Sequence, residues 1–142
     1  MMWEEVSARL SAARTYWLAT TLPSGAPHAA PVWGAVCDQA LYLYSERSTV
    51  KARNLARDPR VLIHLESGDD VLIVNGTAAD IGEPASVPFV VAALAAKYTR
   101  PGDRQYLPDA DPAFDVVYAV RAQSALAWRL DDYAGSQRRW SG

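Results

Sequence analysis

The chain has 142 residues and a net charge of −2, and half of its residues are hydrophobic. This size and composition are typical of one globular domain, spanning residues 1–142. The near-neutral charge excludes an electrostatic argument for binding nucleic acid or an anionic membrane, so we expect neither partner. The single cysteine, Cys37, excludes an intrachain disulfide and a cysteine metal cluster.

The N-terminal segment predicts a helix. Trp3, Val6, Leu10 and Ala13 recur at the spacing of one helical face. The first residues are acidic and lack the apolar core of a secretory signal. No apolar run in the chain approaches the roughly 20 residues of a membrane span. We therefore expect a soluble, cytoplasmic protein.

Two adjacent hairpins follow in the prediction. Residues 15–22 and 28–36 are rich in aromatic, β-branched and aliphatic side chains, and they flank a Pro-Ser-Gly-Ala turn at 23–26. A second turn at 38–39 leads into an alternating run at 41–45. These segments indicate three antiparallel strands.

A basic segment at residues 45–60 comes next and contains five of the fourteen lysines and arginines. Ser48 and Thr49 carry hydroxyls of the type that caps a helix, and Asp58-Pro59 ends the helix. The free N–H groups and dipole of such a helix start favour an anion at the same place as Lys51. The alternative is an ordinary solvated helix whose charges maintain solubility.

The segment after this helix predicts two strands. Residues 60–66 alternate between apolar and polar side chains, and a polar turn at 67–70 separates them from an apolar run at 71–74. Gly76 indicates a bulge or a close approach of two backbones.

The last third of the chain predicts one helix and two strands. Apolar residues from 87 to 98 have a helical spacing, and a Pro-, Gly- and Asp-rich surface loop at 99–112 follows. Two final strands at 115–121 and 124–130 precede a short polar tail that ends in Arg-Arg-Trp at 138–140.

Together these elements predict a mainly β (α+β) fold. Six or seven short strands in hairpin succession, with two to four covering helices, close most easily as a small antiparallel barrel. Long alternating strand and helix units and a G-x-G-x-x-G motif are missing, which argues against a Rossmann domain.

Several motifs of the chain occur together in one known family. The order is Pro31-Val32-Trp33, then Tyr44-Ser45 at a strand end, then Lys-x-Arg-Asn-Leu-x-x-Asp-Pro-Arg at 51–60. With the C-terminal Arg-Arg-Trp, this order resembles the pyridoxamine 5′-phosphate oxidase-like split β-barrel family. Its members use FMN or, in a large branch, the deazaflavin coenzyme F-420. The resemblance implies a homodimer with the cofactors in the groove between the two chains.

The resemblance also implies cofactor-binding roles. One group of residues lines and flanks the isoalloxazine ring, a second holds the phosphate at the helix start, and a third comes from the partner chain, with one of its two arginines reaching the site. These groups are Pro31, Val32, Trp33, Tyr44 and Ser45; Thr49, Val50, Lys51 and Arg53; and Trp128, Arg138 and Arg139. The alternative, without the resemblance, is that Lys51 and Arg53 are solvated helix residues and that Trp33 and the other tryptophans fill the core.

Two departures from the family pattern bear on function. Val50 stands directly before Lys51, where the flavin-phosphate oxidases carry arginine, and Arg53 could supply part of the lost charge. Trp128 is followed by Arg-Leu-Asp and not by the pyridoxal-binding Arg-x-His. We therefore do not expect pyridoxamine-phosphate oxidation. The Lys-x-Arg-Asn-Leu form is similar to the deazaflavin branch.

The expected activity follows from the cofactor. A flavin or deazaflavin moves the hydride itself, while the protein supplies binding, orientation and electrostatics. We expect an oxidoreductase that transfers a hydride between coenzyme F-420 or FMN and a small organic substrate. The alternative is a carrier that binds a flavin, a deazaflavin or a tetrapyrrole without turnover. Neither His28 nor His64 has a metal-ligand partner at a suitable spacing, so no metal site is expected.

Overall fold

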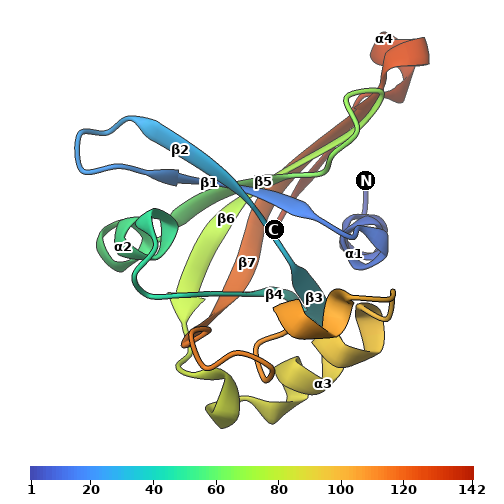
Figure 1. Ribbon diagram of the computed structural model, residues 1–142. Helices are drawn as coiled ribbons and strands as arrows, with labels where there is room; N and C mark the ends of the chain where they lie inside the picture. Colours follow the sequence, from blue (N-terminus) through green and yellow to red (C-terminus); the bar gives the residue numbers. More distant parts are fainter.

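A single antiparallel sheet of eight strands curls into a half-barrel around the core (Figure 1). The computed structural model describes residues Met1–Gly142. No helix has the length and apolar character needed to cross a membrane. The elements are α1 (Trp3–Ala12), β1 (Tyr16–Thr21), β2 (Pro27–Val32), β3 (Gly34–Cys37), β4 (Ala40–Ser45), α2 (Val50–Arg57), β5 (Arg60–His64), β6 (Asp70–Asp80), η1 (Pro84–Ser86), α3 (Pro88–Lys97), η2 (Asp103–Tyr106), β7 (Val116–Arg129), η3 (Leu130–Asp132), α4 (Tyr133–Ser136) and β8 (Arg138–Ser141).

The sheet is split along its longest strand, β7. The strand order is β2-β1-β5-β6-β7-β4-β3, and β8 also pairs with β7. One side of β7 pairs with β6 along nearly its whole length. On the other side, its first half pairs with β4 and its second half with β8. The predicted fold class, a split antiparallel β-barrel with covering helices, is confirmed.

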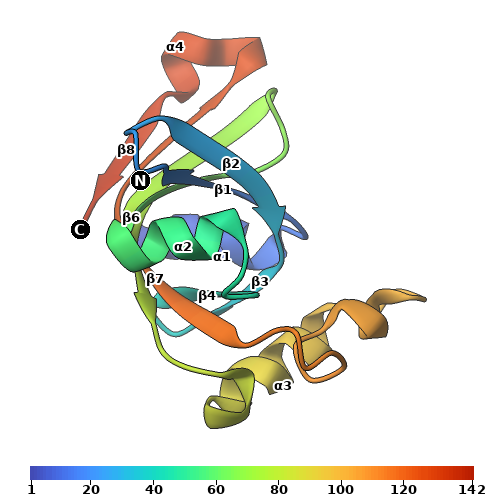
Figure 2. The ribbon, with the colours of Figure 1, turned by 60° about the vertical axis from the view of Figure 1, so that its left-hand side comes forward.

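Two apolar cores hold the elements together. The larger one fills the inner face of the curled sheet, where Leu18, Ile63 and Leu72 pack with Val6 of α1 and Leu55 of α2. The two helices lie against the concave side of the sheet (Figure 2). The smaller core fixes α3 and the loop that follows it to β3 and β4; its buried members are Ala35, Tyr44, Val90, Leu94, Tyr98, Leu107 and Val117.

Residues 28–36 form two strands and not the single strand that was predicted. β2 ends at Val32 and pairs with β1, whereas β3 begins at Gly34 and pairs with β4. A Cβ atom at Gly34 would lie 2.6 Å from the Tyr42 carbonyl oxygen, so β3 approaches β4 more closely than a side chain allows. The prediction is wrong because the chain changes its partner strand at Trp33.

The C-terminal region contains more strand than was predicted. The segments 115–121 and 124–130 form one continuous strand, β7, because a register shift beside Gly76 in β6 absorbs the interruption between them. The tail also forms a strand, β8. The Ser136 hydroxyl accepts a hydrogen bond from the Arg129 N–H at 2.7 Å and helps to return the chain onto β7. This strand was not predicted because its first two residues, Arg138 and Arg139, are charged and give no apolar strand pattern.

Gly76 combines the two features that its position predicted, a bulge and a close approach. A Cβ atom there would lie 2.2 Å from the Arg121 carbonyl oxygen. We expect Gly76→Ala to lower the free energy of unfolding by about 2 kcal/mol, because the β6 and β7 backbones must separate. Urea denaturation measures this loss. Gly68→Ala is the control, since no atom lies within 4 Å of its new Cβ. Equal stabilities of the two variants would contradict the close approach.

Candidate functional site

A cavity of about 520 Å³ opens where the β2–β3 junction, the end of β4 and the start of α2 meet. Residues from the loop after α3 form its remaining wall. The lining residues are Thr15, Pro31, Val32, Trp33, Tyr44, Ser45, Glu46, Thr49, Lys51, Tyr106 and Phe114. Seven of the residues predicted to bind the cofactor are among them: Pro31, Val32, Trp33, Tyr44, Ser45, Thr49 and Lys51.

The start of α2 presents hydrogen-bond donors to this cavity. Thr49 is the N-cap, and its hydroxyl accepts from the Ala52 N–H at 3.4 Å and donates to the Glu46 carbonyl at 2.7 Å. The N–H groups of Val50 and Lys51 have no hydrogen-bond partner in the chain. No acidic residue lies in the first turn. Free N–H groups and the positive end of the helix dipole make this position suitable for an anion.

Lys51 adds an unpaired positive charge at the same place. Its side chain is half-buried and forms no ion pair or hydrogen bond within the protein. Burial lowers the pKa of the Lys51 ammonium, and the nearby Glu46 carboxylate partly opposes this effect. A bound anion would favour the charged form and raise the pKa again. The ammonium and the two free backbone N–H groups are therefore donors that fit a phosphate.

The opposite wall is aromatic and rigid. The Trp33 ring stacks on Tyr98 with centroids 4.2 Å apart and planes 4° from parallel, and the edge of Tyr106 meets it at 5.9 Å. The Arg14 guanidinium lies 4.7 Å from the Trp33 ring centroid. The backbone N–H of Trp33 has no hydrogen-bond partner in the chain. This wall therefore offers a flat apolar surface and one free backbone donor, which suits a planar ring system.

The wall is held by a partly buried ion pair. The two terminal nitrogens of Arg14, Nη2 and Nη1, donate hydrogen bonds to the Asp103 carboxylate at 2.6 and 3.0 Å. The Arg100 backbone N–H donates to the same carboxylate at 3.0 Å. The hydrogen bond from Arg14 lowers the pKa of Asp103, so this carboxylate stays ionised at neutral pH. The pair holds the guanidinium over the Trp33 ring.

A second set of hydrogen bonds fixes the backbone at Gly34. The Gly34 N–H donates to the Tyr98 hydroxyl at 3.0 Å, and this hydroxyl donates to the Arg14 carbonyl at 2.6 Å. The Lys97 ammonium donates to the Gly34 carbonyl and to the Tyr16 hydroxyl, both at 2.7 Å. Burial, followed by the charge of Arg14, lowers the pKa of Lys97 to about 8. This network holds the strand break beside Trp33 in one conformation.

Four lining residues were not predicted from the sequence. Thr15 and Glu46 lie inside predicted segments, while Tyr106 lies inside the predicted surface loop and Phe114 lies two residues after it. The Tyr44 hydroxyl donates to the Tyr106 carbonyl at 2.6 Å, and the Tyr44 ring meets the Phe114 edge at 5.1 Å. The only sequence signal was the presence of two aromatic residues in a stretch otherwise rich in Pro, Gly and Asp.

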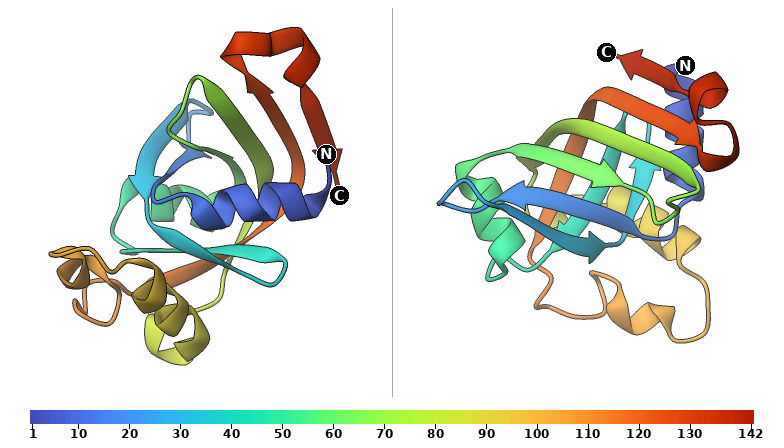
Figure 3. Two further views of the ribbon diagram at one scale, coloured as in Figure 1. Left: turned by 90° about the vertical axis from the view of Figure 1, so that its right-hand side faces the viewer. Right: turned by 90° about the horizontal axis from the view of Figure 1, so that it is seen from above.

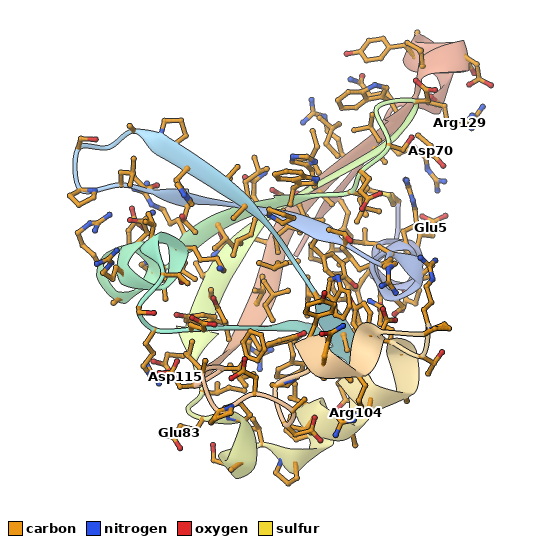
Figure 4. All side chains as sticks on the ribbon, in the orientation of Figure 1. Glu5, Asp70, Glu83, Arg104, Asp115 and Arg129 are labelled. Carbon is orange, nitrogen blue, oxygen red and sulfur yellow. The ribbon has the colours of Figure 1, made fainter.

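The structure does not bring the remaining predicted residues into this cavity. Val50 is exposed beside it, and Arg53 borders a different hollow on the other side of α2. Trp128 and Arg138 line a third hollow, where Arg138 pairs with Glu5 at 2.7 Å, and Arg139 is exposed. Figure 4 places Glu5 at the opposite end of the molecule from Asp115. The roles of Trp128 and of one of Arg138 and Arg139 in a partner's site stay predictions.

Comparisons with known proteins place these observations in a family. The sequence profile described as pyridoxamine 5′-phosphate oxidase matches residues 2–126. A conserved hypothetical protein, Rv2991, from Mycobacterium tuberculosis is similar at 31% identity and a TM-score of 0.74, over 91% of this chain and 85% of that one. A protein described as an F-420 reductase is similar at 26% identity and a TM-score of 0.68, over 84% of this chain and 94% of that one.

A heme-binding protein from Mycobacterium smegmatis shares the fold. The identity is 21% and the TM-score 0.75, over 98% of this chain and 57% of that one. At this identity the likeness concerns the fold alone. No curated protein matches the chain in sequence.

Proposed function

This chain belongs to the pyridoxamine 5′-phosphate oxidase family, and we propose that it is an oxidoreductase that uses the deazaflavin coenzyme F-420. The observation that carries the proposal is the unpaired, half-buried Lys51 ammonium beside the free N–H groups of a helix start, in one cavity with an aromatic wall. The similarity to the F-420 reductase, at 26% identity over 94% of that chain, favours a deazaflavin.

The phosphate site suits a monoanion better than a dianion. Coenzyme F-420 carries a phosphodiester with one negative charge, whereas FMN ends in a phosphate dianion. Lys51 and the two free backbone N–H groups provide one full positive charge, and the Glu46 carboxylate lines the same cavity. Val50 provides no guanidinium and therefore none of the bidentate geometry with which arginine holds a phosphate dianion.

The chain's own groups bind and orient the ring. When bound, the deazaflavin supplies the hydride chemistry. The Trp33 ring offers a flat face, which Tyr106 meets nearly at a right angle, and the free Trp33 backbone N–H is a donor for negative charge that develops on the reduced ring. The Arg14–Asp103 ion pair packs against the Trp33 ring and helps to hold this residue in position.

We further propose that the protein is a homodimer and that the second copy covers the outer face of the sheet. One row of paired residues crosses five neighbouring strands of the sheet, β2, β1, β5, β6 and β7. In this order its members are Pro31, Trp17, His64, Ile73 and Leu126. The Trp17 ring stacks on His64 at 6.2 Å, and the tryptophan is still 36% exposed. No helix covers these strands when they are seen from above (Figure 3). A row of exposed and partly exposed, mostly apolar side chains of this kind suits an interface.

The proposed dimer would complete the open cavity. Pro31 belongs both to this outer row and to the cavity lining. A second chain on the outer face therefore lies beside the cavity mouth and can supply its missing wall. This arrangement gives Trp128 and one of Arg138 and Arg139 a route into the partner's site, as the family resemblance implies.

The carrier function is the second candidate, and the cavity gives it less support than the oxidoreductase. No histidine, cysteine or methionine lines the cavity, so the commonest axial ligands of a heme iron are missing. A carrier of flavin or deazaflavin would need the same phosphate site. Turnover is therefore the property that separates the two functions.

An anaerobic turnover assay tests the oxidoreductase. Reduced coenzyme F-420 is mixed with the protein and a panel of small quinones and enones, and the absorbance of the oxidised deazaflavin is followed. We expect oxidation that requires both protein and acceptor and that is lost with Lys51→Ala at low cofactor concentration. Tight cofactor binding without oxidation by any acceptor would identify a carrier.

The cofactor preference is expected to depend on position 50. Val50→Arg adds a guanidinium beside Lys51 and should strengthen FMN binding relative to coenzyme F-420 by about tenfold, because a charge-assisted contact to the dianion is gained. The measurement is the ratio of the two dissociation constants in wild type and variant, at one salt concentration. Val50→Gln is the uncharged control. An unchanged ratio in Val50→Arg would contradict the proposed phosphate position.

A further inference from the structure

A second cavity, of about 660 Å³, lies between α3 and the segment of residues 108–115. Its lining is formed by small or apolar residues together with three carboxylates. The lining residues are Glu83, Pro84, Ala85, Pro88, Val91, Ala92, Ala95, Pro108, Asp109, Pro112, Phe114 and Asp115. This volume is within the range of small-molecule sites in proteins.

α3 has more apolar surface than its core contact uses. Val90 and Leu94 are fully buried on its inner side. Val91, Ala92 and Ala95 line the cavity on the other side, where both alanines are exposed. The helix carries a single charged residue, at its last position. A helix that is apolar on all sides is normally buried, so the outer face of α3 lacks a partner in the isolated chain.

The charged side chains that line this cavity are all negative. Asp109 is matched by Arg104, at 2.5 and 2.9 Å, and Asp115 accepts a hydrogen bond from the Arg47 N–H at 2.7 Å. The Glu83 carboxylate has no partner in the chain. Figure 4 shows Glu83 and Asp115 near one another at the end of the molecule that also holds Arg104. The cavity therefore combines apolar walls with uncompensated negative charge.

We propose that this cavity is a second ligand site, which binds a small organic cation with an apolar body, such as an aryl-alkyl amine. The α3 alanines and the prolines of the facing segment contact the body, and Glu83 with Asp115 contacts the ammonium. The charge selects a cation over an anion, because no basic side chain lines the cavity.

The site is separate from the cofactor cavity but shares one wall with it. Phe114 lines both cavities, and its edge meets the Tyr44 ring at 5.1 Å. None of the remaining lining residues is common to the two. The proposal therefore does not depend on the cofactor, and it is tested by binding alone.

The test uses three probes that share one apolar body and differ in charge: phenylbutylamine, phenylbutanol and phenylbutanoate. Calorimetric titration of the wild-type protein should give the order amine, alcohol, carboxylate, from tightest to weakest. Amide chemical shifts of Ala92 and Ala95 should move with the amine. Glu83→Gln should weaken amine binding by about two- to fivefold and leave alcohol binding unchanged, since a rim charge contributes little and only to the cation.

A matched pair of variants tests the location. Ala92→Trp fills the cavity and should weaken amine binding at least tenfold. Ala96→Trp makes the same change at an exposed alanine of α3 outside the lining and should leave amine binding unchanged. Equal affinities for the three probes, no binding of any probe at millimolar concentration, or equal effects of the two tryptophans would overturn the proposal. So would a change of oligomeric state in Ala92→Trp, since a second copy would then occupy this face.

Discussion

Replacing Lys51 with alanine is expected to weaken the binding of coenzyme F-420 by about 10- to 150-fold, because a charge-assisted hydrogen bond to a phosphate contributes about 1.5–3 kcal/mol. The thermal stability of the protein without cofactor should change little. In the absence of a ligand, the Lys51 ammonium makes no hydrogen bond or ion pair whose loss would destabilise the fold, and burial disfavours its charge. Fluorescence titration at one salt concentration measures the affinity of the wild-type protein and of the variant for coenzyme F-420.

Arg53→Ala is the matched control for this experiment. It removes one positive charge from the same helix, but Arg53 lies outside the cavity and has no ion-pair partner. We expect a loss of less than threefold, from long-range attraction alone. Equal losses in the two variants would mean that diffuse charge on α2, and not a phosphate site at its start, attracts the cofactor.

Trp17→Arg is expected to raise the dissociation constant of the dimer by at least about 100-fold. The substitution removes an aromatic anchor from the middle of the outer row and places a charge where the partner would desolvate it, and central tryptophans commonly contribute about 2 kcal/mol or more. Inside the barrel the neighbours Tyr16 and Leu18 are untouched, so the monomer should fold. Sedimentation velocity across a concentration series measures the change.

Phe89→Arg is the control for the dimer experiment. Phe89 is 51% exposed on α3, away from the outer row, and its edge meets Tyr42 at 5.3 Å. This variant should sediment as wild type does. Monomeric Trp17→Arg should also bind the cofactor more weakly, because the cavity loses its second wall. A wild-type protein that is monomeric at micromolar concentration and binds the cofactor fully would contradict the shared site.

The helix-start end of the cavity, where we propose that the phosphate binds, could be predicted because its residues are neighbours in the sequence. A strand end, a capping threonine and a lysine two residues later occupy neighbouring positions, so they lie together in any fold that forms this helix. The Pro31-Val32-Trp33 segment was placed by family resemblance, and the structure brings it to the same cavity. What the sequence could not show is the change of partner strand at Trp33 that exposes this segment.

The aromatic wall was not predictable because its residues are distant in the sequence. Tyr98, Tyr106 and Arg14 reach Trp33 only after α3 and its following loop pack on β3 and β4. Local periodicity carries no information on such contacts. The C-terminal strand was missed for a similar reason: β8 is defined by its pairing with β7 and not by its own composition.

The most direct test of the proposed function is a side-by-side titration of the wild-type protein with coenzyme F-420 and with FMN at neutral pH and one fixed ionic strength. We expect coenzyme F-420 to bind more tightly than FMN, because the start of α2 offers one lysine, Lys51, and no arginine at position 50. Tighter binding of FMN, or a protein that retains FMN through purification, would contradict the assignment.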